Sequence, residues 1–413
     1  AAVGFAGTLM FFLVAISIGL QISLGALVAR SEGAQRRDLA SRYCSSGLLF
    51  SVLFSVVISF FGWLYLEELL SLLGASGQTL EYATRYAGIL LPNMPVLVLG
   101  MSAAAGVRAL GDARRSMWAT IAGSLVNGAL DPLFIFTLGW GLEGAAWASV
   151  VARLVVLVVA WHAIYVVHRL PRRISREEFF ADLKPLLAIA TPAVLTNLAT
   201  PIGGSFVLRA ISQFGDSAVA GAAIMGRITP VALCAIFALS SAVGPIIGQN
   251  AGAGHYDRVR STLRNAMLFN VIYVLVAWGL LALAGDGIVR VFSASDTAAE
   301  LILFYCHFLV GASLFNGALF VSNASFNNLH HPQWATGFNF GRVFLGTIPF
   351  VYLGAHWYGA KGVLLGEALG SVIFGSLAVV AAFYLIRRLE REHVALPEPN
   401  GPDCLEVDRQ APL

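Results

Sequence analysis

The decapeptide GALVARSEGA at residues 25–34 has a counterpart, GPIIGQNAGA, at residues 244–253. Each stretch closes an apolar run, and together they set an offset of 219 residues between the two halves of the chain. Three further pairs keep this register to within one residue: Gly7 with Gly226, Leu110 with Leu329, and Trp140 with Tyr358. Chance matches between Gly- and Ala-rich helices do not keep a register over such lengths. The sequence therefore predicts an internal duplication.

The composition indicates a membrane protein. The 413 residues are 58% hydrophobic and 12% charged, with a mean hydropathy of +0.77, whereas soluble domains are about 25% charged. Backbone groups in lipid find no water, so apolar runs of spanning length must be helical. We expect eleven such spans, at roughly 1–29, 43–70, 82–107, 116–138, 144–167, 186–212, 218–248, 261–285, 299–326, 334–354 and 362–387.

The basic residues predict an orientation. They gather on alternate loops, which predicts that these loops and the C-terminus are cytoplasmic. The principal members are Arg30, Arg36, Arg37, Arg108, Arg114, Arg115, Arg169, Arg172, Arg173, Arg176, Lys184, Arg258, Arg260, Arg264, Arg387, Arg388 and Arg391. The net charge of +3 gives no reason to expect a nucleic-acid partner.

The duplication predicts how the lobes are built. In the repeat register residue 1 corresponds to residue 220, and a whole helix precedes residue 220 in the second half. We expect an all-α membrane protein of twelve spans in two six-helix units, of which about eleven are present because the first is missing. Parallel repeats of this kind place a substrate cavity between the lobes. The expected divisions are an N-terminal lobe at 1–168, a cytoplasmic linker at 169–185, a C-terminal lobe at 186–391 and a disordered cytoplasmic tail at 392–413.

Asp131 is the leading candidate for chemistry, because carboxylates inside the membrane are costly and commonly functional. Asn127 lies one helical turn earlier on the same face, and Pro132 removes a backbone donor beside it. Ser149 is expected at a similar depth on the next helix. These oxygen ligands suit Na⁺, or H⁺ held by the carboxylate. The alternative is a structural aspartate that caps a broken helix or bonds Asn127 alone.

A second candidate set consists of Arg227, Arg342 and Glu367. The first two fall near mid-span, and Glu367 lies inside the last helix. They form either a structural ion pair or a gating or substrate contact. Pro132, Pro192, Pro201 and Pro230 are expected to bend their helices, either as moving points or as kinks that packing tolerates.

Several function classes lack their sequence signals. The four cysteines have no metal-ligand spacing, so no metal is expected beyond a possible Na⁺ at Asp131. The chain has no GxxxxGK[ST], HExxH or GxSxG motif, so neither an ATPase nor a hydrolase is indicated, and no cofactor is expected. An integral membrane enzyme would need clustered histidines or paired acids at a membrane face. A major facilitator carrier would need a basic loop that residues 31–37 do not match.

Four segments together resemble the multidrug and toxic compound extrusion (MATE) family. They are residues 244–253, 108–112, 127–132 and 144–149, and the resemblance covers nearly the whole chain. It implies a V-shaped, monomeric exporter in a bacterial inner membrane, which moves amphipathic organic cations in exchange for H⁺ or Na⁺.

The resemblance also implies roles for particular residues. Asp131, Asn127 and Ser149 match the family's cation site in the N-terminal lobe, with serine in place of the usual threonine. The family's additional acid on the first helix would be absent with that helix. No acid occurs in residues 186–208, which favours coupling through the N-terminal lobe. The alternative within the superfamily is a flippase for a lipid-linked saccharide, which would need clustered arginines and no carboxylate in the cavity.

Overall fold

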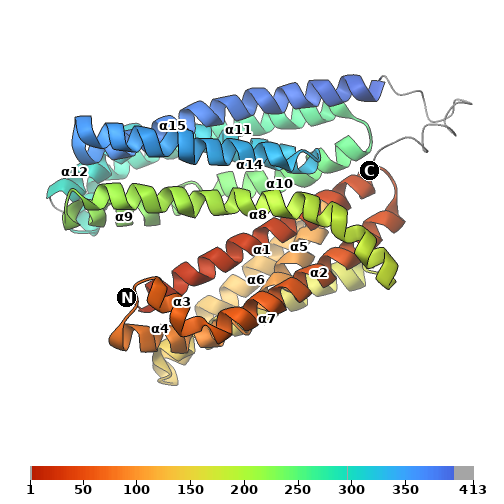
Figure 1. Cartoon of the computed structure of the whole chain (residues 1–413), viewed down its shortest axis with the longest axis horizontal. Helices are drawn as coiled ribbons and strands as arrows, with labels where there is room; N and C mark the ends of the chain where they lie inside the picture. Colours follow the sequence, from red (N-terminus) through yellow and green to blue (C-terminus); the bar gives the residue numbers. More distant parts are fainter. Residues whose placement is uncertain (1, 295, 395–413) are drawn as a thin grey trace, which may run out of the picture.

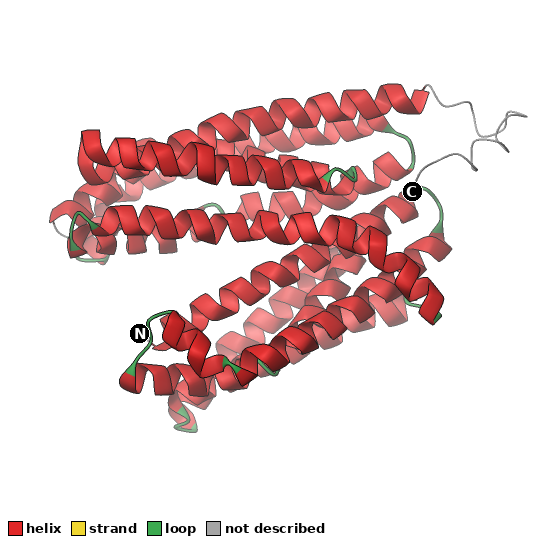
Figure 2. Ribbon diagram, viewed as in Figure 1, coloured by secondary structure: helices red, strands yellow, loops and turns green. Residues whose placement is uncertain are grey.

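The computed structural model describes residues 2–294 and 296–394, and the regular elements in that part of the chain are helices (Figures 1 and 2). Residues 2–167 form an N-terminal lobe. Its elements are α1 (Ala2–Gly33), α2 (Arg37–Leu64), α3 (Leu66–Leu72), α4 (Gly77–Leu90), α5 (Met94–Ala109), α6 (Ala113–Pro132), the π-helix η1 (Leu133–Thr137), α7 (Gly141–Trp161) and the π-helix η2 (His162–Val167).

Residues 176–394 form a C-terminal lobe that packs beside the first in Figure 1. Its elements are α8 (Arg176–Ser212), α9 (Asp216–Ala232), α10 (Cys234–Gly252), α11 (Tyr256–Val291), α12 (Asp296–Phe304), η3 (Tyr305–Leu309), η4 (Val310–Ala312), α13 (Ser313–Asn328), α14 (Pro332–Gly341), η5 (Arg342–Thr347) and α15 (Ile348–Val394). Most of the expected tail, 395–413, lies outside the described residues.

The described residues contain nine helices long and apolar enough to cross a membrane, or ten when α4 and α5, bent by 49°, count as one. The bend between α4 and α5 and the continuous helix assignment over the last two expected spans account for the difference from eleven. The span expected at 218–248 is interrupted at Leu233, so α9 and α10 are separate helices. The last two expected spans are two helices that meet without a loop at Gly359, where φ is +60°, and they count as one in this total. Gly354 lies against the backbone of Gly362, so the chain reverses at Gly359.

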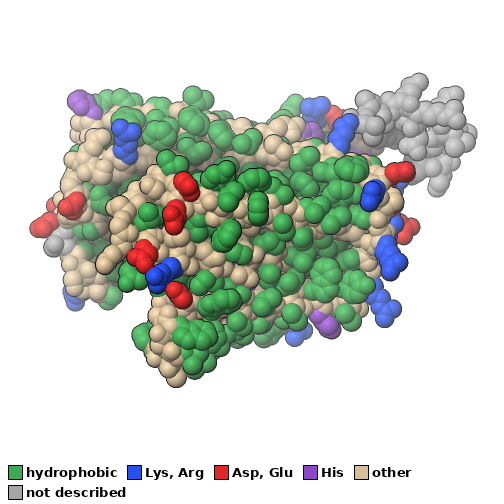
Figure 3. Space-filling view, turned by 60° about the horizontal axis from the view of Figure 1, so that its bottom comes forward, with side chains coloured by type: hydrophobic (Ala, Val, Ile, Leu, Met, Phe, Trp, Pro, Cys, Tyr) green, Lys and Arg blue, Asp and Glu red, His purple; other side chains and the backbone are tan. Residues whose placement is uncertain are grey.

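The two ends of the bundle differ in charge. On the face shown in Figure 3, Lys and Arg side chains gather at the end where the C-terminal segment leaves, and hydrophobic side chains cover the middle. We call this the basic end; it holds the turns at 34–36, 110–112 and 253–255. The two lobes converge at the basic end and diverge toward the opposite, open end (Figure 1).

Glycines mark where the lobes meet. At the basic end α1 crosses α10 so closely that a Cβ on Gly33 would lie 2.0 Å from the carbonyl oxygen of Gln249. A Cβ on Gly252 would lie 2.1 Å from the carbonyl oxygen of Arg30. The Gln249 amide also donates to the Ala109 carbonyl at 2.7 Å, which joins the lobes again. Near the open end, Gly4 and Gly7 of α1 have no such neighbour within 4 Å. We call the Gly33–Gly252 crossing the glycine seam.

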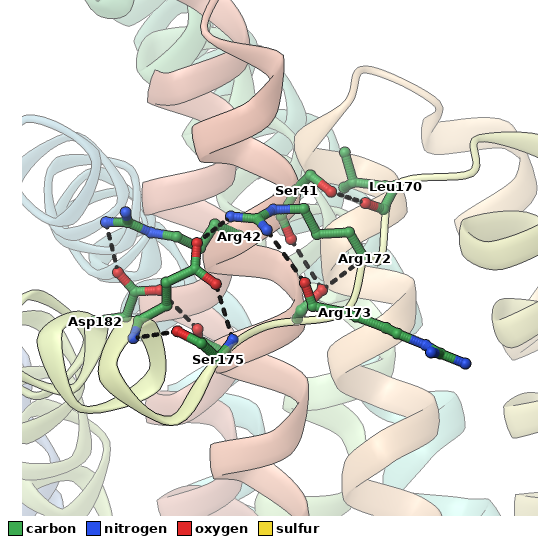
Figure 4. A network of polar contacts seen from close by, with 10 residues as sticks. Ser41, Arg42, Leu170, Arg172, Arg173, Ser175 and Asp182 are labelled. Carbon is green, nitrogen blue, oxygen red and sulfur yellow. Dashed lines mark hydrogen bonds and ion pairs between the residues drawn. The ribbon is translucent and has the colours of Figure 1, made fainter.

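The segment between the lobes is anchored on α2 by the polar network of Figure 4. Asp182 is 1% exposed, pairs with Arg42 at 2.9 Å and accepts a 2.7 Å hydrogen bond from Ser46. Ser175 and Glu178 form a capping box, which starts α8 ten residues before the expected span. The expected linker is therefore partly helical, and its buried carboxylate is paired, as a buried charge requires.

A cap at the basic end gives a first prediction. Asp112 accepts hydrogen bonds from the Arg115 backbone N–H at 3.1 Å and from His168 at 2.9 Å, so it caps α6 and holds the end of η2. Partial burial raises the pKa of its carboxyl, but the hydrogen bonds from Arg115 and His168 outweigh burial and hold the pKa at about 2.

Because the folded pKa lies below the unfolded value of about 3.9, the Asp112 contribution is complete above about pH 4 and is lost as the pH falls toward 2. We expect Asp112→Ala to lower the free energy of unfolding by about 0.5–2 kcal/mol at pH 7. Thermal unfolding in detergent measures the loss. Asp257→Ala, an exposed aspartate at the start of α11, is the control. An equal loss in both variants would contradict the capping role.

Candidate functional site

A cavity of about 460 Å³ lies between the lobes. It is lined by α1 and α5 from the N-terminal lobe and by α8, α10, α13 and α14 from the C-terminal lobe. Phe11, Phe237 and Phe320 contribute aromatic surface, and the last two stack at a tilt with ring centroids 5.3 Å apart. The position between two lobes is where parallel-repeat transporters hold their cargo.

Six side-chain amides line this cavity. They are Gln21, Asn197, Asn323, Asn327, Asn328 and Asn339. Gln21 is 7% exposed and Asn327 is 3% exposed. Among the described residues, the Nε2 atom of Gln21 and the Oδ1 atoms of Asn327 and Asn328 have no hydrogen-bond partner. Buried polar atoms are nearly always satisfied in folded proteins. These three buried atoms therefore hold hydrogen-bonding capacity that the described protein atoms leave unused.

Arg108 is the one charged side chain among the residues that line the cavity. It ends α5 near the basic end and donates to the Ser116 hydroxyl at 2.8 Å. No carboxylate pairs with it in the described part of the chain. The cavity thus has one fixed positive charge, and the sequence analysis did not select its source, Arg108, as a site residue.

Asp131 lies outside this cavity, within the N-terminal lobe on α6. Its side chain is half-buried, and Asn127 Nδ2 donates to its Oδ1 at 3.5 Å. Pro132 ends α6, and the chain continues as the π-helix η1, in which Leu138 N–H bonds the Leu133 carbonyl at 2.9 Å. Such π-helical turns commonly mark functional positions. The structure therefore brings Asn127 and Asp131 together beside an irregular turn.

Ser149 lies on α7, which packs antiparallel to α6. Two close contacts set the register: Gly123 against Val156, and Gly144 against the Phe134 carbonyl. Between these contacts, Ser149 falls at the depth of Asn127 and Asp131. No hydrogen bond joins Ser149 to either residue among the described atoms. Its role as a third ligand therefore stays a prediction.

The sequence analysis missed Arg153, which lies one turn after Ser149 on α7. Its guanidinium donates to the Leu90 carbonyl at 2.9 Å, at the bend between α4 and α5. Tyr86 of α4 interacts electrostatically with both Arg153 and Asp131. A charged residue inside an apolar span was the available signal, in Val150-Val151-Ala152-Arg153. The polar interior of the N-terminal lobe thus holds a cationic group as well as Asp131.

The second predicted set is not a single site. Arg342 is 9% exposed and donates to Asn316 Oδ1 at 3.1 Å, and it interacts with Glu367 at longer range without an ion pair within 4 Å. Arg227 lines a separate apolar groove of about 500 Å³ with Tyr273 and other residues of α9 and α11. None of the three lines the cavity between the lobes.

The four predicted bend positions all lie within or at the end of helices. α8 continues through Pro192 and Pro201, and the hydroxyls of Thr196 and Thr336 each donate to the Pro192 carbonyl at 2.8 Å. Pro230 precedes the interruption at Leu233. Pro132 precedes η1.

Comparison with known proteins connects these features to a family. The MatE family profile matches residues 1–133 and 192–353. The chain is 28% identical over 395 residues to a FAD transporter of Shewanella oneidensis, covering 94% of this chain and 86% of that protein. It is 25% identical over 407 residues to the multidrug export protein MepA of Staphylococcus haemolyticus, covering 95% and 87%.

The fold has close counterparts among solved structures. One is the outward-facing conformation of a multidrug resistance MATE family transporter of the MOP superfamily, with a TM-score of 0.88 and 23% identity, covering 94% of this chain and 88% of that one. The repeat, the two-lobe helical bundle and the profile match agree. The chain belongs to the multidrug and toxic compound extrusion family of multi-pass membrane transporters.

Proposed function

We propose that this chain is a secondary antiporter that exports flat amphipathic organic molecules in exchange for H⁺ or Na⁺. It would act as a monomer in a bacterial inner membrane, with its basic end in the cytoplasm and without a cofactor or nucleic-acid partner. The observation that carries the proposal is the Asn127–Asp131 pair at 3.5 Å, inside the N-terminal lobe and apart from the cavity between the lobes. Two separate sites allow an ion and a cargo to be exchanged through a coupling free energy between the sites.

The ion site is suited to a small hard cation. A carboxylate and an amide oxygen are ligands that Na⁺ accepts, and the carboxylate alone holds H⁺. The irregular backbone of η1 begins directly after Pro132, so a cation bound at Asp131 would alter the packing of α6 against α7. We propose that cation binding there changes which end of the two-lobe bundle is open. The cargo in the cavity and the ion at Asp131 would then each favour one conformation.

Two observations bear on the class of cargo, and they point to cargoes of opposite charge. The family resemblance implies organic cations, and one relative is named a multidrug exporter. Another relative is named a FAD transporter, and FAD is an anion. A lipid-linked saccharide flippase would require several arginines in the cavity. Arg227 and Arg342 do not line it, so that alternative has little support.

Transport into liposomes tests the antiport. The protein is reconstituted with FAD or ethidium on one side and an imposed pH or Na⁺ gradient across the membrane. We expect one of the two gradients to drive uphill accumulation of at least one cargo, and the effective gradient identifies the ion. Cargo that only equilibrates, with neither gradient able to drive it uphill, would show that the protein is not an antiporter.

A further inference from the structure

We propose that the cavity between the lobes selects flat heteroaromatic anions rather than organic cations. The inference rests on the proposed function, because it names the cargo of the same site. It is carried by the one charge and by the amides of the cavity wall, together with the aromatic side chains between them.

The charge of the wall is positive and uncompensated. The membrane-embedded parts of the six lining helices contain no carboxylate that reaches the cavity. The acids on those helices are Glu32, Glu177, Glu178 and Asp182, and all four lie at the basic end outside the lining. A cation that enters would lose its hydration, meet Arg108 and find no counter-charge. An anion would gain a charge-assisted hydrogen bond from the guanidinium.

The amides of the cavity wall indicate the chemistry of the uncharged part of the cargo. A side-chain amide presents a donor and an acceptor side by side and pairs with the edge of a heteroaromatic ring, as Asn and Gln do with adenine. Gln21 from α1 and Asn327 and Asn328 from α13 line the cavity from opposite lobes, and each has one buried side-chain atom without a hydrogen-bond partner among the described residues. Phe11, Phe237 and Phe320 supply flat apolar surface against which a ring can stack. Ring, edge and anionic tail are therefore each matched by a different part of the wall.

The position of Arg108 also favours one direction of transport across the membrane. It lies at the end of α5 near the basic end, so it is the charge that a cargo from the proposed cytoplasmic side would meet first. When the lobes part at the basic end, a single positive group at that mouth of a low-dielectric cavity concentrates anions there. Export of an anion also agrees in sign with a membrane potential that is negative inside.

Equilibrium binding to the detergent-solubilised full chain tests the inference without any gradient. The probes are FAD, riboflavin and ethidium, of which the first two share the isoalloxazine ring, and FAD adds an anionic pyrophosphate and an adenosine. We expect FAD to bind at least about tenfold more tightly than ethidium, a ratio in the range of one charge-assisted hydrogen bond. Equal or tighter binding of ethidium, or no binding of either probe, would overturn the inference.

Two variants each make the charge of the wall more negative by one, the first by removing a cation and the second by adding an anion. Arg108→Gln is expected to weaken FAD binding about tenfold and to leave riboflavin binding unchanged, with Arg108→Lys intermediate. Asn327→Asp keeps Arg108 and is expected to weaken FAD and strengthen ethidium. Arg264→Gln removes an exposed arginine of α11 and serves as the matched control. A uniform loss for all three probes in Arg108→Gln would show a structural role instead.

Transport separates failure of this inference from failure of the antiport. Exchange of an anion for an incoming cation moves net positive charge inward, so an inside-negative potential set with K⁺ and valinomycin should accelerate FAD export. If ethidium is driven by the ion gradient and FAD is not, the antiport stands and the cargo class is wrong. If FAD binds selectively and no gradient drives it, the cargo class stands and the antiport is wrong.

Discussion

Asp131→Asn is expected to abolish gradient-driven transport, with uphill accumulation at least about tenfold below that of the unchanged protein. The substitution keeps the shape of the side chain and its contact with Asn127 but removes the group that carries charge or takes up a proton. A Na⁺ ion would lose its one carboxylate ligand in the pair, and H⁺ would have no base. Uptake of cargo against its gradient in liposomes measures the effect.

Loss of coupling has to be distinguished from loss of the fold. Exchange of labelled for unlabelled cargo at equal concentrations needs the cavity and not the gradient, so Asp131→Asn should retain it. Glu143→Gln is the matched control, since Glu143 is an exposed acid at the start of α7 whose distance to Arg85 is 4.0 Å. Unchanged uphill accumulation in Asp131→Asn would remove Asp131 from the coupling site, and loss of both activities would indicate a structural aspartate.

The helical, two-lobe architecture follows from signals in the sequence because lipid leaves the backbone few choices. Apolar length defines a span, and a shared register defines a repeat. The interruptions are harder to predict, since they depend on contacts between helices. Leu233 ends a helix that composition alone continues, whereas α8 continues through Pro192 and Pro201.

The residues of the candidate site also differ in whether the sequence alone could bring them together. Asn127 and Asp131 could be paired from their spacing, because residues four apart share a helix face. Arg108 and Asn327 are 219 residues apart, and only the packing of the lobes places both on one cavity. Arg108 sits next to a predicted cytoplasmic loop, where an arginine is expected by the positive-inside rule. The position of Arg108 beside that loop therefore gave no indication that its side chain lines the cavity.

The glycine seam gives the second large expected effect. At the basic end α1 and α10 touch through backbone, and Gly252 has no room for a Cβ beside the Arg30 carbonyl. Gly252→Val would force the helices apart at the one end where the lobes converge. Overpacking of a close contact costs about 1–3 kcal/mol, and each 1.4 kcal/mol changes an equilibrium about tenfold. We expect the variant to populate a form opened at the basic end and to lose most of its uphill transport.

The distance between spin labels at Arg36 and Arg258, exposed residues on opposite lobes, measures this opening in a cysteine-free background. The distribution should shift to longer distances in Gly252→Val and remain unchanged in Gly279→Val, because nothing lies within 4 Å of a Cβ at Gly279. An unshifted distribution with transport lost would mean that the added side chain damages the fold without opening the seam. If the shift appears while Asp131 is intact, closure of the seam is a separate requirement from ion binding. The double variant Gly252→Val with Asp131→Asn then measures how far closure of the seam and ion binding depend on each other, and this dependence is the coupling.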